Sequence, residues 1–296
     1  MASEALQTII DLLRNRPPAE SMTMEEYRAG LDDLGSSFAL PEGTRGEPLT
    51  FAGRPAEWVQ AGDAKPGRTI LFLHGGAYVR GSIVSHRGLV ARLCARSGAR
   101  ALVIEYRLAP ENPHPAALED ALAAYRQLIA EGIDPASLVV AGDSAGGGMT
   151  LALLVALRDG GDPLPRAAVT LSPWSDLAIT GESVKSRVDQ DPFLDGPYLH
   201  LMAGRYLGGQ DPRTPSASPL FADLHGLPPL LVQVGSAECL RDDSLRVAEK
   251  ARAAGVEVTF EEWPEMIHVW HLFAHALPEG QQAIDRVGEW LEPHWP

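Results

Sequence analysis

The sequence of 296 residues is long enough for one large α/β domain or two smaller ones, and its 45% hydrophobic and 22% charged residues are typical of a soluble globular protein. Its net charge of −14 argues against nucleic acid and anionic membranes as partners, because both attract basic surfaces. The two cysteines make no disulfide framework, and neither a signal-peptide pattern nor an apolar run of membrane-spanning length is present. We therefore expect a cytoplasmic protein.

Residues 1–45 predict two amphipathic helices ahead of the first strand. Apolar residues recur from Leu6 to Leu13 with the spacing of one helical face. Thr23 and Glu26 have the spacing of a capping box at the start of a second helix. The apolar faces of both helices must pack on something. They either complete the core or cover an active site as a cap, and the sequence leaves both possibilities open.

From residue 46 onward, short apolar stretches alternate with helical patterns. The predicted strands are 48–51, 56–60, 69–73, 101–106, 138–141, 167–171, 230–234 and 256–262, and the predicted helices lie near 89–95, 116–130, 145–157, 244–254 and 284–291. This alternation predicts an α/β fold with a mostly parallel sheet covered on both faces. Ligands of such sheets bind beyond the carboxyl ends of the strands. A strand at 256–262 near the sheet edge could pair across a homodimer.

The alternation stops between residues 176 and 227, a stretch rich in proline, glycine and aspartate. One helix is predicted there, at 198–207, opened by Asp195-Gly196-Pro197 and closed by Gly208-Gly209. An insertion of this size within a compact domain is usually functional or a lid. We therefore expect the segment to contribute to a cap.

The segment 138–157 carries the strongest motif, Gly142-Asp143-Ser144-Ala145-Gly146 between a predicted strand and a predicted helix. This context indicates a nucleophile elbow, in which a serine on a tight turn needs neighbours without a Cβ atom two residues away on each side. A Gly-rich loop that only packs closely or binds phosphate is the alternative. The phosphate-binding motif G-x-x-x-x-G-K-[ST] is absent, and so is G-x-G-x-x-G with an acidic residue downstream, which weakens that alternative.

A serine nucleophile needs a base, and the base needs an acid to orient it. In hydrolases with this elbow the chain order is serine, acid, histidine, so both partners should follow Ser144. His268 follows the predicted strand 256–262 after a five-residue loop, at a strand's carboxyl end, whereas His271 and His275 continue into a predicted helix. A metal site is disfavoured, because no H-E-x-x-H motif accompanies these histidines. We expect His268 to be the base.

The acid should follow the predicted strand 230–234. Glu238 lies in the loop just beyond that strand, and we favour it as the acid. Asp242 is the alternative, although an acidic residue at the start of a helix also serves as a cap or as a partner of the helix dipole.

An oxyanion hole needs backbone N–H groups aimed at the developing charge. The N–H of Ala145, the residue after the nucleophile, should supply one. The sequence His74-Gly75-Gly76-Ala77 follows the strand 69–73 and offers the others. We favour Gly75 and Gly76, with Gly76 and Ala77 as the alternative pair.

These residues resemble those of the hormone-sensitive-lipase-like (bacterial family IV) carboxylesterases of the α/β-hydrolase fold. The resemblance rests on residues 74–76, 105–111, 142–147 and 235–242, followed by His268, and covers most of the chain from about residue 69. It implies an eight-stranded type of sheet, with 46–296 as the catalytic domain, 176–227 as a cap insertion and 1–45 as cap helices. The family's third glycine is Ala77 here, and its frequent aspartate is Glu238.

The resemblance implies a serine esterase that needs no cofactor or metal and acts on short- to medium-chain acyl esters. A lactone or an acetylated small metabolite is the alternative substrate, and a non-catalytic binding protein on the same fold is a remote alternative. Arg107 and Glu111 are expected to form a structural ion pair. For the aromatic residues that could line the pocket, packing in the core is the favoured role (Phe38, Tyr78, Trp174, Tyr206).

Overall fold

Eight strands form one sheet in residues 3–17 and 19–296, the part of the chain that the computed structural model describes. Positions 1, 2 and 18 of the predicted N-terminal segment lie outside the described residues. The strands are β1 (Thr44–Phe51), β2 (Arg54–Ala61), β3 (Thr69–Leu73), β4 (Arg100–Ile104), β5 (Leu138–Asp143), β6 (Ala167–Leu171), β7 (Leu230–Gly235) and β8 (Val258–Trp263).

The strand order is β1-β2-β4-β3-β5-β6-β7-β8. β2 runs antiparallel to both β1 and β4, and every other neighbouring pair is parallel. Parallel neighbours need crossover connections, which place helices on the faces of the sheet and bury its central strands. All residues of β3, β5, β6 and β7 are accordingly buried. The predicted α/β-hydrolase fold with a mostly parallel sheet is confirmed.

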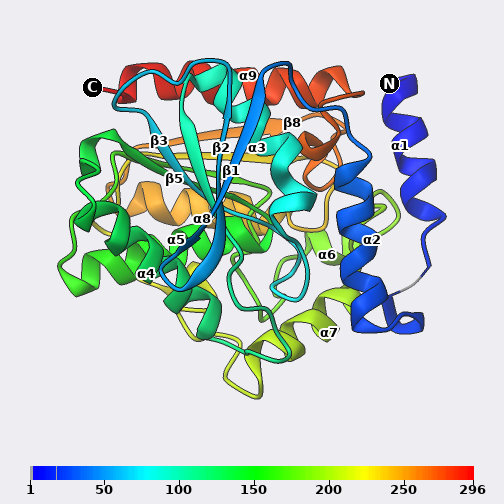
Figure 1. Ribbon diagram of the computed structural model, residues 1–296. Helices are drawn as coiled ribbons and strands as arrows, with labels where there is room; N and C mark the ends of the chain where they lie inside the picture. The colour runs from blue at the N-terminus through cyan, green and yellow to red at the C-terminus, as the bar shows by residue number, and fades with distance from the viewer. Residues whose placement is uncertain (1–2, 18) are drawn as a thin grey trace.

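Helices cover both faces of the sheet (Figure 1). The α-helices are α1 (Glu4–Arg14), α2 (Met24–Ser36), α3 (Ile83–Ser97), α4 (Ala116–Ala130), α5 (Ala145–Gly160), α6 (Ser183–Ser186), α7 (Gly196–Leu207), α8 (Arg241–Ala253) and α9 (Pro278–Leu291). Short 3₁₀ turns lie at Ala19–Ser21, Pro135–Ser137, Pro219–Phe221, Trp270–Phe273 and Glu292–His294. None of the helices in the described part of the chain combines the length and the apolar character that crossing a bilayer requires.

Alternate side chains of the central strands enter two separate cores. In β3, Ile70 and Phe72 pack with apolar residues of α3 and α9, while Leu71 and Leu73 pack with those of α4 and α5. This period of two is the geometry of a strand buried on both faces. The two cores hold the sheet between its helical layers and leave the carboxyl ends of the strands for the loops.

The two N-terminal helices lie beside the loops at one end of the sheet (Figure 1). On α1, Leu6 and Leu13 pack against the segment that contains Ile267 and Trp270. α2 begins with the predicted capping box, because the Thr23 hydroxyl accepts the Glu26 N–H and the Glu26 carboxylate accepts the Thr23 N–H. The apolar face of α1 therefore packs on the loop that carries His268.

Several sequence expectations need correction. β1 begins at Thr44, earlier than expected, because most of its side chains are exposed and carry no apolar signal. The residues after His268 form a 3₁₀ turn, Trp270–Phe273, and not the expected α-helix. Arg107 and Glu111 do not pair. The segment between them is irregular, and each forms an ion pair with a residue of a helix. Arg107 pairs with Asp120 of α4 at 2.9 Å, and Glu111 pairs with Arg28 of α2 at 2.6 Å.

Candidate active site

Ser144 lies on the tight turn between β5 and α5. Its φ of 51° and ψ of −119° are strained for a residue with a side chain. A Cβ atom on Gly142 would collide with the Gly146 carbonyl, and one on Gly146 would collide with the Leu73 carbonyl. The turn is held on both sides, because the Ser144 N–H donates to the Leu171 carbonyl at 2.8 Å and the Ser144 carbonyl accepts a backbone N–H at 2.8 Å.

Ser144, His268 and Glu238 form a continuous hydrogen-bonded chain. The His268 Nε2 atom lies 2.9 Å from Ser144 Oγ, and its Nδ1 atom lies 2.7 Å from Glu238 Oε2. A carboxylate only accepts hydrogen bonds, so Nδ1 carries the proton of the neutral ring and Nε2 is left to accept the serine hydroxyl. This arrangement suits removal of the serine proton by the imidazole.

Glu238 is itself fixed by its other oxygen. Oε1 accepts the Gly235 N–H at 2.6 Å and the Ser172 hydroxyl at 2.8 Å, and the residue is fully buried. Ser172 Oγ also accepts the N–H of Val269 at 3.2 Å, which ties the histidine loop to the same point. The three residues of the chain follow β5, β7 and β8, so the parallel sheet brings distant sequence segments together at one edge.

The other sequence candidates point elsewhere. The Asp242 carboxylate accepts the Ser183 N–H at 2.9 Å and pairs with Arg241. His271 Nε2 lies 2.9 Å from Gln233 Oε1, and burial lowers the pKa of His271 to about 3. His275 stacks on Phe38 at a ring distance of 4.2 Å.

The surroundings of His268 favour its protonated form. Burial alone would lower the pKa of His268, but the hydrogen bond and the charge of Glu238 outweigh burial, and the charges of Asp191 and Asp143 add to them. The pKa is therefore raised above its ordinary value. A charged imidazolium formed during a reaction would be stabilised at this position.

The loop 74–78 contributes only some of the expected N–H donors. The Gly75 N–H donates to Asp143 Oδ1 at 2.9 Å, so the expectation that it faces the oxyanion needs correction. The N–H groups of Gly76, Ala77 and Ala145 have no protein acceptor among the described residues. Gly76 and Ala77 line the pocket in front of Ser144, whereas Gly75 does not. The alternative pair, Gly76 and Ala77, fits the geometry, because the N–H of Gly75 already donates to the buried carboxylate of Asp143.

Asp143 and His86 support this loop, and the chain order gives His86 no role because His86 precedes Ser144. Asp143 Oδ2 lies 3.3 Å from His86 Nε2, whose Nδ1 lies 2.8 Å from Ser85 Oγ. Burial alone would raise the pKa of Asp143, but the charge and hydrogen bond of His86 outweigh burial and keep the pKa below its usual value. The Tyr106 hydroxyl donates to the His74 carbonyl at 2.7 Å from the other side. Asp143 belongs to the elbow motif, and its position next to Ser144 is the sequence feature that could have indicated its role in holding this loop.

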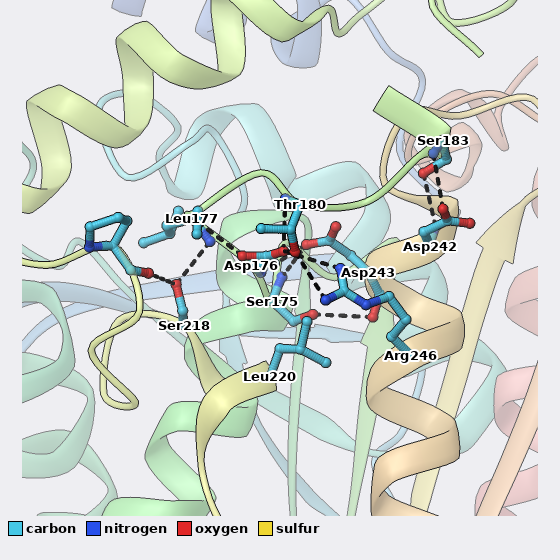
Figure 2. A network of polar contacts seen from close by, with 12 residues as sticks. Ser175, Asp176, Leu177, Thr180, Ser183, Ser218, Leu220, Asp242, Asp243 and Arg246 are labelled. Carbon is cyan, nitrogen blue, oxygen red and sulfur yellow. Dashed lines mark hydrogen bonds and ion pairs between the residues drawn. The ribbon is translucent and has the colours of Figure 1, made fainter. Parts of the chain in front are cut away.

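The loop after β6 is anchored to α8 through Asp243 (Figure 2). Asp243 Oδ2 accepts the N–H groups of Ser175 and Asp176 at 2.9 and 2.8 Å. Arg246 donates to the neighbouring Asp176 carboxylate at 3.1 Å. Burial, and then the charge of Asp176, raise the pKa of Asp243. The network holds in place the loop that carries Trp174, a wall of the pocket.

A mainly apolar pocket opens in front of Ser144 and His268. Its apolar and aromatic lining comprises Leu31, Trp174, Phe193, Leu194, Tyr198, Leu199, Leu240 and Leu272. Of the aromatic residues singled out in the sequence, Trp174 lines the pocket, whereas Tyr78 and Tyr206 stack on each other at 3.7 Å within the core. In residues 3–17 and 19–296, no three histidine, cysteine or acidic side chains converge as metal ligands would.

Comparison with known proteins extends over nearly the whole chain. Residues 70–272 match the sequence family described as alpha/beta hydrolase fold. An acetyl-hydrolase of Streptomyces hygroscopicus is 47% identical over 98% of this chain and 97% of that protein. Two solved structures each align over 99% of both chains. One is EstE5 soaked with p-nitrophenyl butyrate, with a TM-score of 0.95 and 47% identity. The other is an esterase from the bacterial hormone-sensitive lipase family, with a TM-score of 0.96 and 45% identity.

Proposed function

This chain belongs to the bacterial hormone-sensitive lipase family of α/β hydrolases and is a carboxylic-ester hydrolase, and we propose that it acts through an acyl-enzyme formed on Ser144. The observation that carries this proposal is the continuous chain of hydrogen bonds from Ser144 through His268 to Glu238. The three hydrogen-bonded side chains are buried, and the Glu238 carboxylate accepts two further donors, the Ser172 hydroxyl and the Gly235 N–H. The site is therefore preorganised without substrate.

In the first half-reaction, His268 Nε2 removes the proton of Ser144 while Oγ attacks the ester carbonyl. Glu238 keeps the proton on Nδ1 and stabilises the imidazolium that results. The tetrahedral intermediate then collapses, its C–O bond to the alcohol breaks, and the imidazolium gives its proton to the departing alkoxide. The alcohol leaves, and the acyl group stays on Ser144.

In the second half-reaction, water takes the place of the alcohol. His268 accepts a proton from the water as its oxygen attacks the acyl carbonyl. Collapse of the second tetrahedral intermediate breaks the bond to Ser144 Oγ, which recovers its proton from the imidazolium. The carboxylic acid leaves and the enzyme returns to its starting state.

The developing oxyanion would be held by the N–H groups of Gly76, Ala77 and Ala145. All three lack protein acceptors in the described chain, and the Ala145 N–H stands at the N-terminus of α5. Removal of one such donor typically costs about 100- to 1,000-fold in kcat. The role of Gly75 is then to fix the loop through Asp143.

The substrate side of the proposal is a short- to medium-chain acyl ester. The pocket is lined mainly by leucine and aromatic side chains, which accept a hydrocarbon chain and reject water. The S. hygroscopicus relative carries the name acetyl-hydrolase, so an acetylated small molecule is a second candidate substrate for the same residues.

The pocket would be closed by a cap built from residues 1–45 and the insertion 176–227. The Tyr27 hydroxyl of α2 hydrogen-bonds the Tyr198 hydroxyl of α7 at 2.6 Å, which joins the two segments above the pocket. Leu31 of α2 and Leu199 of α7 both line the pocket. These contacts support a shared covering role.

The test is the replacement Ser144→Ala, with 4-nitrophenyl acetate and butyrate as substrates. We expect nearly all turnover to be lost, with an unchanged circular dichroism spectrum as the control for folding. A fluorophosphonate probe should label the wild-type protein on Ser144 and leave the variant unlabelled. Turnover retained by the alanine variant would contradict the proposal.

A further inference from the structure

A second cavity adjoins the pocket in front of Ser144. It lies between the end of α1, the start of α2 and the insertion residues 188–198. Arg80, Phe193 and Tyr198 line both the cavity and the pocket, so the two spaces share a wall. Arg16 also lines the second cavity. The two spaces are therefore adjacent at Arg80, whose side chain borders both.

Arg16 and Arg80 are held in place by aromatic rings. The Arg16 guanidinium lies 5.3 Å from the centre of the Phe193 ring, and that of Arg80 lies 4.1 Å from the centre of the Tyr27 ring. Ring contacts position a guanidinium without occupying its N–H donors. Both side chains are only partly exposed, so their orientation is preset.

Neither guanidinium has a carboxylate partner among the described side chains. The Nε atom of Arg80 is buried and has no hydrogen-bond partner in the part of the chain that the structure describes. Burial, and then the charge of Arg80, lower the pKa of Arg16 to about 10. Arg28, on the neighbouring helix α2, is by contrast fully engaged with Glu111. Two cations that repel each other thus lack an ion-pair partner among the described side chains, in a protein of net charge −14.

Three acidic residues also border the cavity, Asp189, Asp191 and Asp195, and the carboxylates of the last two accept backbone N–H groups. Asp191 accepts the N–H groups of Phe193, Leu194 and Cys239. Asp195 accepts the Tyr198 N–H as the N-cap of α7. None of these carboxylates lies within ion-pair distance of the two guanidiniums in the described chain. The free donors of the cavity are therefore those of the arginines.

We propose that Arg16 and Arg80 bind a carboxylate on the substrate, so that this esterase hydrolyses esters bearing a carboxylate a few bonds from the scissile carbonyl. The planar guanidinium matches a carboxylate in a paired, charge-assisted geometry. The hydrocarbon between the two groups would lie along Phe193 and Tyr198, which line both spaces. This inference rests on the proposed function, because it places the reacting carbonyl at Ser144.

The test compares matched esters. One pair is mono-4-nitrophenyl glutarate and 4-nitrophenyl pentanoate, with the carboxylate on the acyl side. The other pair is 4-acetoxybenzoate and its methyl ester, with the carboxylate on the alcohol side. The readout is the ratio of kcat/KM for the anionic ester to kcat/KM for the neutral one. Each variant's turnover of the neutral ester reports that it has folded.

Arg80→Gln and Arg16→Gln should each lower this ratio about tenfold or more in at least one pair, as expected for loss of a charge-assisted contact. Arg80→Lys should retain part of the ratio, since a point charge remains. Arg100→Gln is the matched control, because Arg100 also lies over a ring, that of Trp58 at 4.2 Å, but is exposed and lines neither space. Its ratio should equal that of wild type.

Two failures are distinguishable. If Ser144→Ala still hydrolyses the neutral esters, the proposed function itself fails. If neutral hydrolysis depends on Ser144 but both glutamine variants keep the wild-type ratio in both pairs, only the carboxylate subsite is overturned.

Discussion

The replacement Glu238→Gln tests the hydrogen-bonded chain at its buried end. Glu238 Oε1 accepts two donors, the Gly235 N–H and the Ser172 hydroxyl, while Oε2 accepts only the Nδ1 proton of His268. A glutamine has a single oxygen, so its NH₂ group must take one of the two positions. The carboxylate accepts hydrogen bonds with both oxygens, whereas the amide must place its donor NH₂ group either at the Gly235 N–H and Ser172 side or at the His268 side.

Either choice weakens the base. If the NH₂ group faces the Gly235 N–H, two donors oppose each other in a dry site, at a cost of about 1–3 kcal/mol. If it faces His268, the Nδ1 atom must accept, the ring proton moves to Nε2, and the imidazole no longer accepts the Ser144 hydroxyl. The second arrangement is the cheaper one, and a wrong tautomer of this kind lowers kcat by about 10⁴-fold, or about 5 kcal/mol of activation free energy.

The assay is kcat for 4-nitrophenyl acetate, with KM, the circular dichroism spectrum and the thermal midpoint recorded beside it. Asp242→Asn is the matched control, because it makes the same carboxylate-to-amide change at the other acidic candidate. Its carboxylate serves Ser183 and Arg241, so the variant should turn over close to wild type. If Glu238→Gln stays within about tenfold of wild-type kcat while Asp242→Asn loses activity, the acid has been misidentified.

Three further outcomes follow from the same geometry. The proposed mechanism uses the neutral imidazole of His268 as the base, and the pKa of His268 is raised. We therefore expect kcat/KM to fall as the pH drops through a value above 6.5, and a pH profile with its acid limb below 6.5 would contradict this. Gly76→Ala should lower kcat at least about 100-fold. The backbone φ at this position is +115°, and a Cβ atom would collide with the Arg80 carbonyl, so the N–H of residue 76 would move. A wild-type kcat in a folded variant would contradict this role for the N–H. Burial raises the pKa of Asp191 from 3.8 to about 6. The native state therefore binds this proton more tightly than the unfolded state, and stability falls as the pH rises from about 4 to 6. In urea unfolding, the free energy of wild type minus that of Asp191→Asn should decrease by about 2 kcal/mol over that window, and a constant difference would refute the assignment.

The sequence was sufficient wherever a local constraint or the chain order decides the outcome. The glycines at 142 and 146 are required by one tight turn, so the elbow is readable from five residues. The alternation of strands and helices predicts the parallel sheet, because each parallel pair needs a crossover. The order serine, acid, histidine then led to Ser144, Glu238 and His268, and His268 lies within hydrogen-bonding distance of the other two. Their catalytic roles remain a prediction.

Other features depend on side chains that meet only after folding. The sequence offers adjacent glycines at 75 and 76, but the buried carboxylate of Asp143 decides which N–H faces the pocket. Proximity in sequence suggested a pair between Arg107 and Glu111, whereas the helices supply each with a different partner.

The two arginines beside the pocket are the clearest case of tertiary determination. Arg16 and Arg80 lie far apart in the sequence, and neither belongs to a motif that the sequence reveals. Packing of the N-terminal helices against the insertion places both guanidiniums on one cavity, and neither forms an ion pair with a described carboxylate. Local backbone geometry and chain order thus determine the fold and the meeting of Ser144, His268 and Glu238. The charge around the pocket is decided by long-range packing, because electrostatic contacts depend on distances in space and not along the chain.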